Sequence, residues 1–149
     1  MTGRNVEHNS RFNQVIMRIR SPRTTAMITE RGHLTCYGAC SFEDAHRAAR
    51  RFARIIQKMG FPVSFSNFKI NNVTTVFQSF RVRLNRLSEA LRGHCSYEPE
   101  RFTGLYFHFE NVRICVFHTG KMIFTGSSDL SMYTRAFWRL YPALCNARR

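Results

Sequence analysis

The stretch Gly120–Ser128, GKMIFTGSS, repeats a pattern that has already occurred at Gly32–Ser41 as GHLTCYGACS. In both stretches a short strand-like run lies between two glycines, and a serine follows shortly after the second glycine. Self-similarity of this kind indicates duplication and determines the whole fold. The sequence around the two stretches should therefore repeat as well.

The flanking sequence does repeat in the same order. One copy, RFNQVIMRIRSPRTTAMITERGHLTCYGACSFEDA, begins at Arg11, and the other, RFTGLYFHFENVRICVFHTGKMIFTGSSDLSM, begins at Arg101. Each opens with Arg-Phe and continues through alternating strands to the two glycines. The offset falls from 102 − 12 = 90 at the phenylalanines to 120 − 32 = 88 at the first glycines, so the second copy has the shorter turn. Only two copies occur, which excludes a solenoid.

A long helix is expected after each third strand. Ser41 followed by Asp44 is typical of a capping box, and the apolar stripe that starts there stops at Gly60. The second helix is expected to start near residues 127–128 and to end or be disturbed around Pro142.

The segment between the copies, FPVSFSNFKINNVTTVFQSFRVRL at 61–84, is rich in β-branched and aromatic residues and predicts one long or bent strand. A short helix at about Arg86–Leu91 should follow. The second repeat is then complete, whereas the first, from Arg4 on, lacks an opening strand and a short helix. We expect an α+β fold in which 1–60 form a partial first repeat, 61–149 form a complete second repeat, and both share one domain.

The composition favours a polyanionic partner. Twenty-three Lys and Arg against nine Asp and Glu give a net charge of +14 and a sequence pI near 10.8. Nucleic acid is the leading interpretation, with an anionic membrane or a merely soluble basic protein as alternatives. No apolar run is long enough to span a bilayer and the N-terminus does not resemble a signal peptide, so we expect an intracellular protein without membrane attachment.

Neither a metal site nor enzyme chemistry is expected. If Cys36 and Cys40 share one strand, they lie roughly 13 Å apart, too far for a common zinc ion. The five cysteines form no secreted-scaffold pattern, and buried, inert thiols are favoured. No Ser-His-Asp set, phosphate loop, HExxH or paired-carboxylate signature occurs. The sequence therefore predicts no cofactor and no catalytic activity.

One face of each predicted sheet must pack on a helix, and the other is free to bind. Alternation gives this second face an apolar centre with small hydroxyls: Met27, Thr29, Thr35, Tyr37, Cys115, Phe117, Ile123 and Thr125. Basic residues form its rim: Arg11, Arg18, Arg20, Arg23, Arg83, Arg113 and Lys121. Such a surface is either a second core or a binding face suited to the DNA minor groove.

Five segments carry a resemblance to a known family. VIMRIRSPRTTAMI, AARRFARIIQKMGFP, FKINN, SYEPERFTGL and GKMIFTGSS are closely similar to the core of the TATA-box-binding protein family, and the similarity runs from about Arg4 to the C-terminus. The resemblance implies a saddle of two pseudo-symmetric repeats, with DNA on the concave face of a curved antiparallel sheet and helices on the convex side.

The resemblance also implies residue roles on the DNA. Two phenylalanines per half wedge between base pairs in the family; Phe102 and Phe117 supply both in the second half, whereas the first has Phe12 but Thr29 in the partner position. Asn72 and Thr125 match residues that bond to base edges. Asn72 alternatively caps a turn. Tyr37 replaces the equivalent threonine and either packs, stacks or contacts DNA.

Further positions match phosphate and protein contacts of the family. The phosphate contacts fall on Arg11, Arg18, Arg23, Arg113 and Lys121, which as a set favour DNA; singly, each is equally well a solvated charge. Glu98 and Glu100 match the segment that receives transcription factor IIB, although Arg101 replaces a leucine beside them. Arg51, Arg54 and Lys58 match the helix face that meets transcription factor IIA and repressors, or form a solvated face.

Two hypotheses follow. The first is a nuclear general transcription factor that binds and bends promoter DNA and recruits factors IIA and IIB and the TATA-binding-protein-associated factors. The second is an interaction module that binds those factors with weak or no specific DNA binding; Thr29, Tyr37 and the missing strand favour it. An exposed sheet edge could pair with another chain in a homodimer, and a truncated gene is the alternative explanation of the missing strand.

Overall fold

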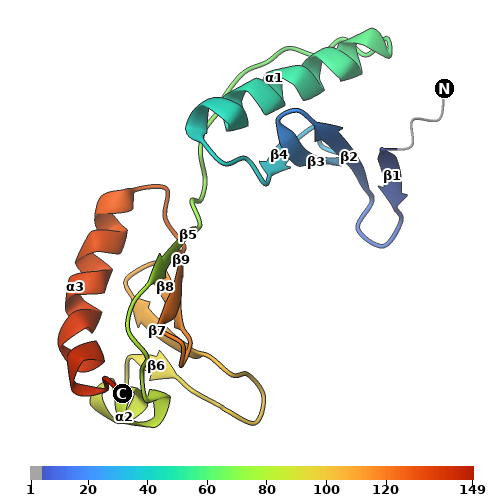
Figure 1. The fold of residues 1–149 in the computed structure, drawn as a ribbon. Coiled ribbons are helices and arrows are strands. Elements are labelled where there is room, and N and C mark those ends of the chain that lie inside the picture. Colours follow the sequence, from blue (N-terminus) through green and yellow to red (C-terminus); the bar gives the residue numbers. More distant parts are fainter. Residues whose placement is uncertain (1–4) are drawn as a thin grey trace. The chain divides into compact units, whose positions relative to one another are not determined.

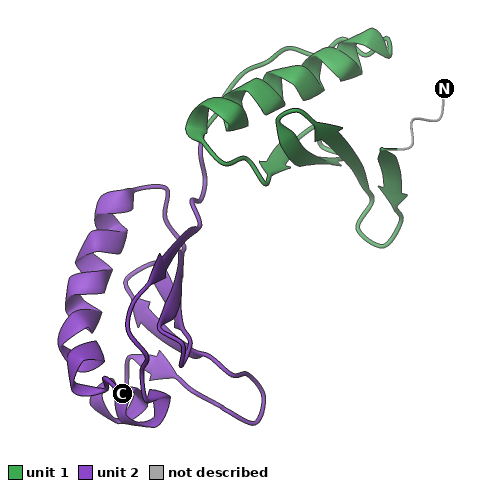
Figure 2. Ribbon diagram, in the orientation of Figure 1, with its two compact units in different colours: residues 1–69 green, residues 70–149 purple. Residues whose placement is uncertain are grey.

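The computed structural model describes residues 5–149 and divides the chain into two compact units, residues 1–69 and 70–149 (Figures 1 and 2). Residues 1–4, which include the expected start of the first repeat at Arg4, lie outside the described residues. The sequence places the repeat boundary after Gly60, and the structure divides the chain after Lys69.

Unit 1 contains a four-stranded antiparallel sheet in the order β1-β2-β3-β4, followed by one long helix. Its elements are β1 (Val6–Asn9), β2 (Gln14–Arg20), β3 (Arg23–Thr29), β4 (Leu34–Tyr37) and α1 (Phe42–Lys58). The strands follow one another along the sheet, as expected when short turns join antiparallel neighbours.

The capping box predicted for α1 is present. The Ser41 hydroxyl accepts a hydrogen bond from the Asp44 backbone N–H at 3.0 Å, which satisfies one of the free donors of the first turn. Ala48 and Phe52 on the inner face of the helix are fully buried against Met17 and Ala26 of the sheet. These contacts cover one face of the unit 1 sheet with α1 (Figure 1).

Unit 2 contains a five-stranded antiparallel sheet in the order β5-β9-β8-β7-β6 and two helices. Its elements are β5 (Thr75–Gln78), α2 (Leu84–Ala90), β6 (Cys95–Ser96), β7 (Leu105–Phe109), β8 (Val112–Val116), β9 (Lys121–Thr125) and α3 (Leu130–Asn146). β6 to β9 and α3 repeat the order of β1 to β4 and α1. β5 and α2 have no counterpart in the described part of unit 1, so the expected α+β fold with an incomplete first repeat is confirmed.

Of the two outcomes expected around Pro142, an end or a disturbance of the helix, the end is wrong. Asp129 caps the helix by accepting a hydrogen bond from the Ser131 N–H at 2.9 Å, and the helix continues beyond Pro142 to Asn146. A proline inside a helix costs stability because it removes one hydrogen bond. The residues directly after it offset this cost, since Ala143 and Leu144 pack into the core of unit 2.

The long strand predicted for 61–84 is also wrong. Only Thr75–Gln78 forms a strand, and it pairs with β9. The part of the segment that belongs to unit 1 packs on α1: the His46 ring lies 5.4 Å from Phe65 and 4.9 Å from Phe68, centroid to centroid, with both pairs edge to face. The aromatic residues Phe65 and Phe68 therefore hold a connecting segment on a helix and do not build a strand.

The cysteines differ in exposure. Burial raises the pKa of the half-buried Cys36 thiol to about 11, as expected for an inert cysteine. Cys40 is exposed because it lies in the turn between β4 and α1, so the expectation that both are buried is wrong for Cys40. Within residues 5–149 no group of three potential ligands could hold a metal ion, and no helix has the length and apolarity to cross a membrane.

Tyr133 offers a test of the unit 2 core. Its buried hydroxyl accepts from the Ser127 N–H at 3.1 Å and contacts the backbone carbonyls of Ser127 and Val73. Tyr133→Phe leaves a buried N–H without an acceptor and should lower the free energy of unfolding by about 1–3 kcal/mol. Urea denaturation followed by circular dichroism measures the change. Tyr141→Phe, at an exposed position of α3, is the matched control and should change stability by less than about 0.5 kcal/mol.

Candidate nucleic-acid interface

Each sheet has one face that does not pack on its long helix. In unit 2 the register places Cys115 opposite both Tyr106 and Ile123, and Arg113 opposite both His108 and Thr125. Residues of the other parity, including Ile114, Val116, Met122 and Phe124, lie in the core beneath α3. We call the face that carries Tyr106, His108, Arg113, Cys115, Ile123 and Thr125, with the residues that continue it along the strands, the open face of unit 2. The corresponding face of the unit 1 sheet is the open face of unit 1.

Phe102 and Phe117 meet on the open face of unit 2. Their ring centroids are 5.8 Å apart and the rings are inclined by 66°, while Phe102 stacks on Tyr106 at 5.1 Å. Gly104 makes this packing possible, because a Cβ there would lie only 2.7 Å from Cε1 of Phe102 and 3.0 Å from Sγ of Cys115. The two phenylalanines proposed as wedges are therefore held together before any ligand binds. Strand alternation was sufficient to find Tyr106, which the sequence reasoning missed.

Asn72 and Thr125 also lie together. The Asn72 amide donates to Oγ1 of Thr125 at 3.1 Å, and Oδ1 of Asn72 accepts from the Gly126 N–H at 2.8 Å. Gly126 has φ of +108°, and a Cβ there would lie 2.1 Å from the Asn111 carbonyl oxygen, so only glycine fits this position. The contacts orient the two side chains on which base-edge contacts are expected. These hydrogen bonds join the Asn72 side chain to the end of β9 and not to its own turn.

The corresponding end of unit 1 is built differently. Phe12 is 63% exposed, against 36% for Phe102, and the Arg11 guanidinium lies 5.6 Å from its ring centroid. Gln14 occupies the position of Gly104 in the repeat, and Thr29 occupies that of Phe117. Any side chain in the place of Gly104 meets the space that Phe102 fills, so Phe12 cannot dock in the same way. Comparison of the two repeats could have revealed Gln14, which the sequence reasoning overlooked.

The expected phosphate contacts differ in their availability. Arg11, Arg23 and Lys121 are exposed, and the Arg113 guanidinium lies 5.7 Å from the centroid of Tyr106. Arg18 instead pairs with Glu7 of β1 at 2.9 Å. The sequence reasoning missed this partner because nothing in the sequence fixed the register of β1 against β2. In the free protein one acid therefore partly neutralises the open face of unit 1.

The residues expected to bind proteins are exposed. Arg54 and Lys58 lie on the surface of α1, and Arg51 there donates a hydrogen bond to the Ser21 carbonyl. Glu100 is exposed, whereas Glu98 forms an ion pair with Arg101 at 3.1 Å. Arg101, which replaces the leucine of the family pattern, thus pairs with one of the two acids expected to meet factor IIB.

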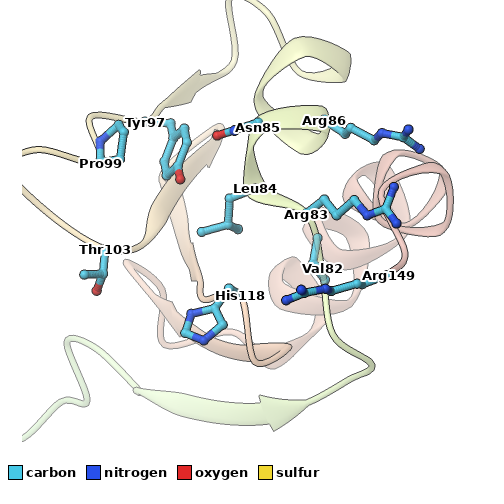
Figure 3. Close-up of a pocket in the computed structure, with 10 residues that line it drawn as sticks. All are labelled: Val82, Arg83, Leu84, Asn85, Arg86, Tyr97, Pro99, Thr103, His118 and Arg149. Carbon is cyan, nitrogen blue, oxygen red and sulfur yellow. The ribbon is translucent and has the colours of Figure 1, made fainter.

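A cavity lies beside that acidic segment (Figure 3). Val82, Leu84, Tyr97 and Pro99 give it an apolar lining, and cationic or titratable side chains surround it: Arg83, Arg86, His118 and Arg149. Arg83 was expected on the rim of the DNA-binding face, but it directly precedes α2 and lines this cavity instead. The sequence offered no signal for the cavity because its walls come from four separate segments.

Comparisons with known proteins agree on one family. The model of "Transcription factor TFIID (or TATA-binding protein, TBP)" matches residues 1–59 and 67–147. The chain is 42% identical to a TATA-box-binding protein of Acetabularia peniculus over 153 residues, covering all of this chain and 80% of the relative. It is 44% identical to a TATA box-binding protein-like 2 of Rattus norvegicus, of which it spans only 43%.

A solved structure shows the same fold. The TBP of Methanococcus jannaschii superposes with a TM-score of 0.81 at 24% identity, covering 96% of this chain and 84% of the other.

Phe102→Ala tests the packing on the open face of unit 2. Burial raises the pKa of the Cys115 thiol, and the Phe102 ring lies beside its sulfur. Removing the ring exposes the thiol and lowers its pKa, so more thiolate is present at a given pH. We expect iodoacetamide to label Cys115 severalfold faster at pH 8, as measured by peptide mass spectrometry. Phe12→Ala in unit 1 is the control; acceleration of the same size there would contradict the assigned packing.

Proposed function

This chain belongs to the TATA-binding protein family, and from that premise we propose that it is a nuclear general transcription factor that binds promoter DNA in the minor groove. It bends the duplex and nucleates assembly of the transcription pre-initiation complex, without catalytic chemistry of its own. The observation that carries the proposal is the open face of unit 2, where the pairs Phe102–Phe117 and Asn72–Thr125 lie on one sheet.

The composition of that face suits the minor groove. The groove floor presents few hydrogen-bonding groups, so an apolar surface with a small number of polar side chains fits it. Wedging a side chain between base pairs costs a few kcal/mol per step in lost stacking, which is recovered through the contacts of the bent duplex. Phe102 and Phe117 already contact each other, so little conformational entropy is lost when they insert.

Affinity in this proposal comes mainly from the basic residues. The net charge is +14, and Arg11, Arg23, Arg113 and Lys121 are exposed. Each phosphate contact releases condensed counter-ions, and the effects add. Arg18 contributes less than its position implies, since its pairing with Glu7 must break or be shared with a phosphate.

A second candidate function is an interaction module with weak DNA binding. Thr29 and Tyr37 stand where a wedge and a base-edge contact are expected, which favours this alternative. The module would bind factor IIA and repressors through Arg51, Arg54 and Lys58, factor IIB through Glu98 and Glu100, and TATA-binding-protein-associated factors. β4 and β5 each end a sheet in the described residues, so either edge could pair with a second copy.

A gel-shift and bending assay separates the two functions. TATA and scrambled duplexes are compared at 50 mM and 200 mM salt. The first function predicts binding that weakens steeply with salt, by roughly 10³-fold or more if six or more phosphates are contacted, with a preference for TATA. Failure to bind any duplex while factor IIA or IIB is still bound would leave the interaction module as the function.

The wedge residues should contribute unequally. Phe117→Ala removes one member of a packed pair, whereas Phe12→Ala removes a phenylalanine whose partner position holds Thr29. We expect Phe117→Ala to reduce the bend angle clearly and Phe12→Ala to reduce it little, measured by energy transfer between the ends of a labelled duplex. Equal reductions would show that Phe12 of unit 1 also kinks the duplex.

Arg101→Leu tests the contact with factor IIB. The substitution frees Glu98 from its exposed ion pair. Such a pair contributes at most about 1 kcal/mol, so affinity for factor IIB should rise by up to about fivefold in a calorimetric titration. Arg139→Leu, which removes the same charge from the exposed surface of α3, should leave that affinity unchanged. A loss of affinity in Arg101→Leu would mean that Arg101 itself makes the contact.

A further inference from the structure

We propose that the open face of unit 1 recognises a guanine at its end of the DNA site, through Gln14 and Thr29. This inference rests on the proposed function, because it specifies which base pair one end of the proposed interface prefers.

Two unsatisfied polar atoms mark the position. Oε1 of Gln14 and Oγ1 of Thr29 are the buried side-chain atoms within the described residues that lack a hydrogen-bond partner. The two residues are directly opposite each other in the β2–β3 register. Cross-strand partners project from the same face of a sheet and lie close together. Two oxygen atoms without hydrogen-bond partners, an amide oxygen and a hydroxyl that can accept or donate, therefore lie side by side.

These atoms are on the open face of unit 1. Their strand neighbours Val15 and Ile28 pack against the core that α1 covers, and alternation places Gln14 and Thr29 on the opposite side. A buried acceptor without a donor costs folding free energy, and native proteins contain few of them. Such a pair on a proposed binding face is explained if the ligand supplies the donor.

The repeat locates the pair at the end of the interface. In unit 2 the register pairs Leu105 with Val116, and Gly104 and Phe117 follow at the next positions. Gln14 and Thr29 are their counterparts, so an amide side chain replaces the glycine beside the Phe102 ring and a hydroxyl replaces Phe117. Because a side chain at the Gly104 position obstructs the docked ring, Gln14 also accounts for the exposure of Phe12. Unit 1 has exchanged a wedge for hydrogen-bonding groups.

The chemistry of the minor groove identifies the base. A·T and T·A pairs present only acceptors there, whereas a G·C pair adds the guanine 2-amino donor. Base pairing leaves one amino hydrogen free, and Oε1 of Gln14 can accept it, shared with Oγ1 of Thr29, while the Gln14 amide nitrogen donates to guanine N3. Oε1 of Gln14, which can only accept, thus finds a donor on a G·C pair and none on an A·T pair.

The turn at residues 10–13, directly before Gln14, gives DNA a route to the two buried atoms. The Asn13 amide donates to a Glu30 carboxylate oxygen at 2.6 Å and closes residues 10–13 beside Thr29. Ser10, Arg11, Phe12 and Asn13 are all exposed, so few contacts resist movement of this turn. DNA that enters the open face displaces the turn and reaches both acceptors.

Inosine provides the sharpest test. An I·C pair lacks only the 2-amino group, so its comparison with G·C isolates the proposed donor. Fluorescence anisotropy is measured on TATA duplexes that carry G·C or I·C at one terminal base pair, at each end in turn. At one end we expect G·C to bind about fivefold or more tightly than I·C, and at the other end we expect no such preference.

Substitutions test whether Gln14 and Thr29 cause the preference for G·C over I·C. Gln14→Ala and Thr29→Val should each reduce the ratio of G·C to I·C affinity, and together they should abolish it. Thr134→Val, an exposed threonine of α3 outside the interface, should leave both affinity and ratio unchanged. Circular dichroism establishes that each variant is folded, and the comparison on the unmodified chain is independent of the variants.

The outcomes separate this inference from the proposed function. Binding with equal G·C and I·C affinity at both ends overturns the inference and leaves promoter binding intact. A preference that survives the double substitution overturns the role of Gln14 and Thr29. Absence of binding to every duplex overturns both the inference and the proposed function.

Discussion

The structure depends on one constraint: a single long helix covers one face of each antiparallel sheet, and side chains alternate between the two faces. In unit 1, Val15, Met17, Ala26 and Ile28 must face α1, so Gln14, Ile16, Met27 and Thr29 must face away. A one-residue shift of register would exchange the two sets. The residues of the proposed interface are therefore placed by the residues that build the core.

The sequence predicted the elements whose signals are local. The capping box at Ser41, the glycines that end the third strands and the order of strands in both repeats depend on near neighbours, and all of them were found. The errors concern longer-range contacts. Residues 61–74 have the composition of a strand, but Phe65 and Phe68 pack on His46 of α1 and Val73 packs against the core of unit 2. Pro142 stays inside α3 because Ala143 and Leu144 are needed in the core.

The sequence was sufficient to predict which residues lie at the candidate site, but not which of their neighbours they contact. Alternation and the family resemblance identified Phe102, Phe117 and Thr125, and the structure brings each beside another proposed contact. The Arg18–Glu7 pair depends on a strand register that no sequence pattern specified. The difference between Gln14 and Gly104 was visible in the repeat, yet its meaning required the 2.7 Å approach to the Phe102 ring.

The open faces of the two halves differ because folding stability depends on the buried cores and much less on these faces. Phe52, Ala48 and Ala26 are fully buried, and substitutions there would create cavities or strain in unit 1. Phe12 and Tyr37 are exposed, so changes at such positions have little effect on the fold and can alter the proposed recognition. After a duplication, the two cores must each remain intact, but their open faces can diverge independently. Under the proposed function, a half that lacks its wedge can keep its fold, its basic rim and its share of DNA affinity while it acquires a different preference for the base pair beneath it.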